Sequence, residues 1–238
     1  AHRDHFEPAM ALEVLAAHPE AEVVGDGRVS GELQETGSDA VRALGSRVHT
    51  IGIKIGERTA LTAGGVPMAV LGVNHGEADR PYLTLGYIME LGGFKIYHQG
   101  DIFPDSNLPF LDSIPWEAEK IDIAFFDPFF FQNETTRRIV LERIRPSAVI
   151  LMHMRDDEVE RYGAQLRPAV PQVVTFAAPM VLATGSTMDL ALRTSVLATV
   201  NVTSVTPFPP TFWTMVSTLT FARASGTIGY ELMCALAP

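Results

Sequence analysis

Two imidazoles and a carboxylate stand within four positions at the start of the chain, at His2, Asp4 and His5. Neutral imidazole nitrogen and carboxylate oxygen are ordinary ligands of divalent cations. A helix is predicted directly behind them, and a loop that enters a helix can aim several side chains at one point. The pattern therefore indicates a metal site. The alternative is a polar tail with chance histidines, and residues 1–8 alone do not decide between the two.

Three further residues of ligand type, His75, Asp101 and His153, each follow an apolar run that is typical of a strand. Strand ends at one edge of a sheet converge in space, and sites of α/β proteins are built there. We therefore predict that all six residues form one metal-binding cluster. The strands concerned are expected at residues 66–73, 94–98 and 148–152.

The stretch from His2 to His5 resembles the end of the His-x-His-x-Asp-His motif of the metallo-β-lactamase-fold hydrolases. The order of the later residues is also similar: a lone histidine, then Gly-Asp, then a histidine after an apolar strand. Residues 97–101 resemble the family's bridging-aspartate loop, and residues 150–154 resemble its last-ligand strand. The resemblance covers roughly residues 1–176, and it looks most like the lactonase-like branch rather than the antibiotic-degrading enzymes.

The resemblance implies two divalent metal ions, with Zn²⁺ preferred for histidine ligands and Mn²⁺ or Fe²⁺ as alternatives. The motif's first histidine would stand two places before His2, where this chain has no residue. We therefore expect the first strands of the fold to be missing and one metal site to lack a ligand. The implied assignment is His2 and His75 at one site, Asp4, His5 and His153 at the other, and Asp101 as the bridge.

Two cations about 3.5–4 Å apart can hold a shared water as hydroxide and polarise a substrate oxygen. Asp4 is predicted to be catalytic as well, since it can accept and pass on a proton. His98 lies three residues before Asp101 and is expected to support the ligands rather than to bind metal. Asp127 follows a strand and is expected to have a structural role.

The chain alternates β-hairpins first and βαβ units later, which predicts an α/β sandwich with helices outside the sheets. The resemblance specifies a four-layer αββα metallo-β-lactamase-like sandwich that lacks its first strands. After about Ala177 charges become rare and Thr, Ser and Pro become frequent. We predict a metallo-hydrolase domain over residues 1–176, incomplete at its N-terminus, and a segment of unknown role over residues 177–238. Helices are expected at 8–17, 38–44, 134–144 and 156–164, and further strands at 21–24, 47–55, 58–63, 83–91, 121–126 and near 173.

The formal net charge is −10 and no run of Lys or Arg occurs, which argues against binding to nucleic-acid phosphates. No uninterrupted apolar run has the length of a membrane-spanning helix, so no membrane partner is expected. The single Cys234 excludes an intrachain disulfide and a multi-cysteine zinc site. These features leave the compartment open, with the cytoplasm slightly preferred to the periplasm. They do not define the oligomeric state.

The expected activity is hydrolysis of a small-molecule ester, lactone or phosphoester by a metal-activated water. One alternative is a catalytically impaired fragment or non-enzymatic relative that binds metal without turnover. The other is an interaction module that acts through residues 177–238.

Overall fold

The computed structural model describes residues 6–77, 79–154, 156–174, 187–192, 196–201, 214–223 and 226–235. The chain divides into two compact units. The first comprises residues 1–90 and 98–110, and the second comprises residues 91–97 and 111–238.

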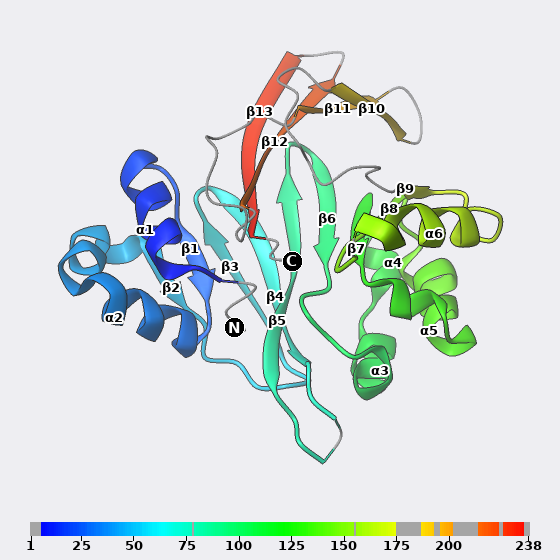
Figure 1. Ribbon diagram of the computed structural model, residues 1–238, viewed down its shortest axis with the longest axis horizontal. Coiled ribbons are helices and arrows are strands. Elements are labelled where there is room, and N and C mark those ends of the chain that lie inside the picture. Colours follow the sequence, from blue (N-terminus) through cyan, green and yellow to red (C-terminus); the bar gives the residue numbers. More distant parts are fainter. Residues whose placement is uncertain are drawn as a thin grey trace. The chain divides into compact units, whose positions relative to one another are not determined.

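The first unit opens with two helices beside a small parallel sheet, drawn in blue in Figure 1. The elements are α1 (Pro8–Ala17), β1 (Val23–Gly25), α2 (Gly27–Leu44), a 3₁₀ turn at Gly45–Arg47, and β2 (Val48–Thr50). The bounds predicted for α1 are confirmed. The strand expected over residues 47–55 is reduced to β2. Arg47 lies before this strand, and its Nη1 donates to the carbonyls of Leu15, His18 and Ala21, which caps the end of α1.

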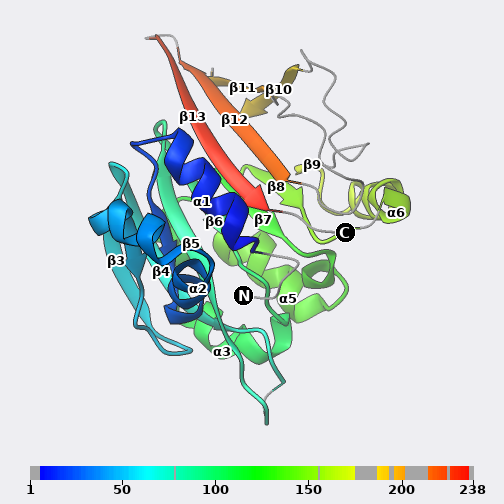
Figure 2. The same ribbon diagram turned by 60° about the vertical axis from the view of Figure 1, so that its left-hand side comes forward.

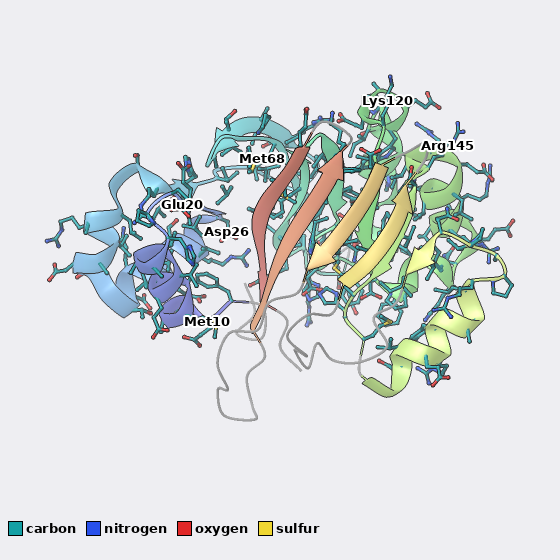
Figure 3. All side chains as sticks on the ribbon, turned by 90° about the horizontal axis from the view of Figure 1, so that it is seen from above. Met10, Glu20, Asp26, Met68, Lys120 and Arg145 are labelled. Atoms are coloured by element: carbon teal, nitrogen blue, oxygen red, sulfur yellow. The ribbon has the colours of Figure 1, made fainter. Side chains whose placement is uncertain are left out.

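The helix predicted from Ser38 to Leu44 is confirmed as the second segment of α2, after the non-helical Gly37, whereas the first segment, which begins at Gly27, is unexpected. Asp26, labelled in Figure 3, is the N-cap, and its Oδ1 accepts from the backbone N–H groups of Arg28 and Val29. The glycines around Asp26 suggest a turn, whereas the cap satisfies the first N–H groups of a helix. A kink at Gly37 (φ −161°, ψ 74°) divides α2 just before Ser38.

Three antiparallel strands follow in the first unit and lie side by side in Figure 2. They are β3 (Arg58–Ala63), β4 (Val66–Asn74) and β5 (Leu83–Leu91), which confirms the three strands predicted there. Ile53, Val70 and Leu85 form a buried core cluster at this sheet. The last six residues of β4 are buried, so its end is held firmly where His75 begins.

The second unit contains a parallel βαβ arrangement, as predicted, in which β7 pairs with β8 and β8 pairs with β9. Its polypeptide reverses at Gly92 and Gly93, whose φ values of 61° and 81° suit a tight turn before β6. The elements are β6 (Phe94–His98), α4 (Trp116–Glu119), β7 (Ile123–Phe126), a 3₁₀ helix η2 (Pro128–Phe131), α5 (Glu134–Arg138), a π-helix η3 (Ile139–Ile144), β8 (Ala148–Leu151), α6 (Asp156–Leu166) and β9 (Val173–Val174).

Asn133 caps α5 as predicted, but the single helix expected over residues 134–144 changes to a π-helix after Arg138. Lys120 and Arg145, labelled in Figure 3, end α4 and η3 in the left-handed conformation, with φ of 54° and 52°. A further helix, α3 (Pro104–Ser113), is unexpected, because Pro109 inside it looks like a helix breaker.

Aromatic side chains form the centre of the second unit. Tyr97 packs against Trp116 and Phe126 with ring centroids 5.0 and 5.6 Å apart. Phe126 in turn packs against Phe130 and Phe131 at 4.9 and 6.1 Å. All five rings are buried, which anchors the ends of β6 and β7.

The residues described after Ala177 form four antiparallel strands, in the order β10-β11-β12-β13. They are β10 (Thr187–Leu192), β11 (Val196–Asn201), β12 (Thr214–Arg223) and β13 (Gly226–Ala235), at the end of the colour scale in Figure 1. The domain boundary near residue 176 and the role of this segment stay predictions. Among the described residues, no helix combines the length and the apolar character needed to cross a membrane.

Candidate metal centre

His75 and Asp101 are brought together in the first unit. His75 follows β4 directly, and Asp101 lies three residues beyond the end of β6. His75 Nδ1 and Asp101 Oδ1 are 3.2 Å apart, and the two side chains are 22% and 25% exposed. The side chains are partly exposed, but His75 Nδ1 itself is buried, and this strengthens its attraction to the carboxylate.

The backbone on either side of His75 is fixed by hydrogen bonds. His75 N–H donates to the Tyr82 carbonyl over 2.8 Å. Asn74 Oδ1 accepts from the N–H groups of Gly76 and Tyr82, both at 2.8 Å. A Cβ at Gly76 would lie 1.9 Å from the Arg80 carbonyl oxygen, so only glycine fits there. The loop after β4 therefore holds the His75 backbone in one place.

Aromatic rings flank the His75 imidazole. Phe103 stacks on it with centroids 5.1 Å apart and an interplanar angle of 10°, and Tyr82 meets it edge-on at 6.2 Å. Phe103 is 46% exposed, so this ring faces solvent as well as the imidazole. The Arg28 guanidinium lies 4.2 Å from the Tyr82 ring centroid, a cation–π contact that orders the second ring.

The Asp101 loop is shaped by His98 and Gly100. Gly100 N–H donates to His98 Nδ1 over 3.1 Å, so this nitrogen is the unprotonated acceptor of the imidazole. Gly100 has φ of 78°, and a Cβ there would lie 2.3 Å from the Leu85 carbonyl oxygen. His98 thus supports the loop that carries Asp101, and its role beside the metal ligands stays a prediction.

His153 is paired with Asp127 in the second unit. Its Nδ1 lies 3.3 Å from Asp127 Oδ2, while Asp127 Oδ1 accepts from the Phe129 N–H over 2.9 Å. A neutral imidazole that donates from Nδ1 carries its lone pair on Nε2, which is the atom available for metal binding. His153 has φ of 55°, an uncommon conformation for a non-glycine residue that clusters at functional sites.

Asp26 and Arg28 form a charged pair at the start of α2. Burial by itself raises the pKa of Asp26, but the Arg28 hydrogen bond, the Val29 N–H and the Arg28 charge outweigh it and lower the pKa overall. Burial likewise opposes the charge on Arg28, and its bond to Asp26 more than compensates, so the pKa of Arg28 rises. Arg28 Nε lies 2.8 Å from Asp26 Oδ2, and the pair anchors the guanidinium that covers Tyr82.

Residues 1–175 match the family described as the beta-lactamase superfamily domain. The chain belongs to the metallo-β-lactamase superfamily. Domains of this superfamily are generally hydrolytic and commonly bind divalent metals such as zinc. The mixed α/β architecture agrees with the metallo-β-lactamase fold, so the predicted superfamily and fold class are confirmed, and the lactonase-like branch stays a prediction. A search of curated proteins found no match.

The donor atoms of His75 and Asp101 fit the metal chemistry of this superfamily. Two ligand atoms about 2.1 Å from one tetrahedral ion stand roughly 3.4 Å apart, close to the 3.2 Å between His75 Nδ1 and Asp101 Oδ1. His153 fits as well, since Asp127 orients its ring in the manner common for metal-binding histidines. Both imidazoles are therefore suitable ligands where they stand.

The predicted six-residue cluster stays a prediction. His2, Asp4 and His5 lie outside the described residues. Within the part of the chain that the structure describes, no three His, Cys, Asp or Glu residues are grouped so as to hold a metal ion. The described pairs are His75 with Asp101 and His153 with Asp127.

The sequence does not predict which residues lie next to the proposed metal ligands. Asp127 contacts His153 in addition to capping η2, and its position at the end of a strand, before Pro128, is the signal that could have suggested this. Phe103 and Asn107 give no such signal, since α3 itself is unexpected.

Proposed function

We propose that this protein is a metal-dependent hydrolase that acts on a small-molecule ester, lactone or phosphoester. The observation that carries the proposal is the contact between His75 Nδ1 and Asp101 Oδ1, two donor atoms of the kinds that bind divalent cations. The superfamily assignment supports it, because domains of this kind are generally hydrolytic.

The residues proposed to hold two divalent ions, with Zn²⁺ preferred, are His2, Asp4, His5, His75, Asp101 and His153. When bound, such ions lower the pKa of a water and polarise the substrate oxygen that is attacked. Asp101 is the residue proposed to be shared by the two ions. A proton on His153 Nδ1 toward Asp127 would leave Nε2 as the nitrogen that binds metal. Asp4 is proposed to accept the proton that the attacking water loses.

The exposed ring of Phe103 favours an organic substrate that has an apolar part. Its ring is 46% exposed and stacks on His75, so one edge is available beside a proposed ligand. Burying an exposed aromatic ring against an apolar group is favourable at about 25 cal/mol per Å². We therefore propose that the alkyl or aryl portion of the substrate packs against Phe103.

The test is a comparison of metal content and hydrolysis. The purified chain is stripped with a chelator, reloaded separately with Zn²⁺, Mn²⁺ or Fe²⁺, and analysed by mass spectrometry for bound metal. Each form is then assayed on aryl esters, lactones, phosphomonoesters and phosphodiesters. The variants are His75→Ala and Asp101→Ala, and the control is His49→Ala, because His49 instead pairs with Glu22 at the β2 edge.

We expect wild-type and His49→Ala proteins to bind metal and to hydrolyse at least one substrate class. The two site variants should lose metal and activity together. Metal binding without hydrolysis of any class would favour the alternative of a metal-binding relative. Full metal content in both site variants would contradict the assigned ligands.

A further inference from the structure

The buried side chain of Asn107 pairs with the backbone of Asn74. Asn107 Oδ1 accepts from Asn74 N–H and Asn107 Nδ2 donates to the Asn74 carbonyl, both over 2.7 Å. The two residues are 1% and 4% exposed. The carboxamide thus makes the same two bonds to Asn74 that a neighbouring strand would make at the end of β4.

The same carboxamide is also bound to the segment that follows Asp101. Asn107 Nδ2 donates to the Phe103 carbonyl over 2.8 Å. Phe103 stacks on His75, and Asn74 is the residue directly before His75. Asn107 therefore ties the chain beside one proposed ligand to the chain beside the other.

Asn74 extends this network past His75. Its Oδ1 accepts from the N–H groups of Gly76 and Tyr82. Asn107 holds the Asn74 backbone, and Asn74 in turn holds the residues that follow His75. A buried carboxamide that satisfies both its donor and its acceptor groups is costly to replace, because each abandoned backbone group stays buried without a hydrogen-bond partner. Asparagine is also a weak helix former, so Asn107 does not stabilise α3 through its helix propensity.

We propose that Asn107 is a positioning residue that sets the separation of His75 and Asp101 and thereby the affinity of the site for metal. This inference rests on the proposed function. Asn107 touches neither ligand side chain in this scheme. It acts through the Asn74 backbone on one side and the Phe103 backbone on the other.

Asn107→Asp is the sharpest variant, because a carboxylate keeps the shape and the acceptor but cannot donate to the Asn74 and Phe103 carbonyls. Asn133→Asp is the matched control, since an aspartate can cap α5 as asparagine does. Leu33→Ala is the second control. It creates a cavity in the buried interior of the first unit and should lower stability without altering the ligands.

The measurements are Zn²⁺ titration of the apoprotein, the visible absorption spectrum with Co²⁺ in place of Zn²⁺, and the melting temperature without metal. We expect Asn107→Asp to lose about 10–100-fold in metal affinity and to change the Co²⁺ spectrum. Leu33→Ala should melt earlier yet keep both. If Asn107→Asp does not fold, Asn107→Ala replaces it, because water can then reach the vacated backbone groups.

A folded Asn107 variant with wild-type affinity and an unchanged Co²⁺ spectrum would overturn the positioning role and leave the proposed function standing. Equal losses in Leu33→Ala and Asn107→Asp would also overturn it, since general destabilisation would then explain both. Absence of metal binding in the wild-type protein would reject the proposed function and this inference together.

Discussion

Asp127 uses one carboxylate oxygen to cap a helix and the other to face His153. Its Oδ1 accepts from Phe129 N–H at 2.9 Å, and its Oδ2 lies 3.3 Å from His153 Nδ1. Asp127, for which a structural role is expected, therefore also contacts a proposed metal ligand. Because His153 has left-handed backbone geometry, its ring position depends on such a contact as well as on the chain.

Asp127→Asn should separate these two functions. The amide oxygen can still cap η2, but the amide NH2 that then faces His153 is a donor and cannot accept the proton on Nδ1. We expect a loss of about 10–100-fold in metal affinity with little change in melting temperature, measured by calorimetric titration. Asp112→Asn, at an exposed pair with Arg143, is the control and should bind metal normally. Unchanged affinity in Asp127→Asn would show that His153 needs no partner or binds no metal.

Asp101→Ala should remove more metal than His98→Ala. Asp101 is proposed to contact the ions directly, whereas His98 accepts a hydrogen bond from Gly100 and supports the loop. Removing a supporting group commonly costs about 10–100-fold in affinity, and removing a shared ligand should cost more. Metal content by atomic absorption after dialysis checks the order. Equal losses would mean that His98 is itself a ligand.

The sequence predicts those parts of the structure that depend on local pattern. Alternating or continuous apolar residues locate β3, β4 and β5, and Pro8 with its apolar face locates α1. The start of α2 and the whole of α3 are missed, because glycines around Asp26 and Pro109 suggest interruptions that the surrounding structure accommodates. Capping and burial overrule local propensity at both places.

The candidate site is likewise only partly predictable from the sequence. The residue types of His75, Asp101 and His153 and their positions after strands are visible in the sequence. The residues that hold them in place are not, because the hydrogen bond that Asn74 N–H donates to Asn107 Oδ1 joins positions 33 residues apart. Such a contact follows from the tertiary arrangement and leaves no spacing pattern.

Gly100→Ala should disturb the Asp101 loop by more than the backbone strain that a positive φ causes at a non-glycine residue. Both Gly100 and Gly56 have positive φ, of 78° and 82°. A Cβ at Gly100 would lie 2.3 Å from the Leu85 carbonyl oxygen, whereas a Cβ at Gly56 has no heavy atom within 4 Å. Gly56→Ala should therefore cost about 1 kcal/mol from backbone strain, and Gly100→Ala should cost more and also weaken metal binding.

Urea unfolding and metal titration of both glycine variants provide the check. Similar free energies of unfolding would show that the Asp101 loop moves easily away from Leu85. A normal metal affinity in Gly100→Ala would show that the position of Asp101 does not depend on this close approach.

The Asp26 carboxylate should make stability fall in acid. Its pKa is lower in the folded protein than the ordinary value of about 3.9. As pH falls, Asp26 therefore takes up a proton in the unfolded chain before it does so in the folded protein. Its contribution to the free energy of unfolding is complete above the unfolded pKa and is lost as pH falls through the folded pKa. Asp26→Asn keeps an N-cap but leaves Arg28 without its charged partner, and we expect a loss of about 1–2 kcal/mol at pH 7.

Urea unfolding from pH 7 to pH 2.5 tests this linkage. The difference in free energy of unfolding between wild type and Asp26→Asn should stay constant above about pH 5 and shrink below pH 4, because protonation removes the charge from the wild-type side chain. Asp39→Asn is the control, since that carboxylate is 92% exposed in its pair with Arg42 and should contribute little at any pH. A wild-type advantage over Asp26→Asn that persists unchanged to pH 2.5 would show that shape and capping, rather than the charge on Asp26, hold the start of α2.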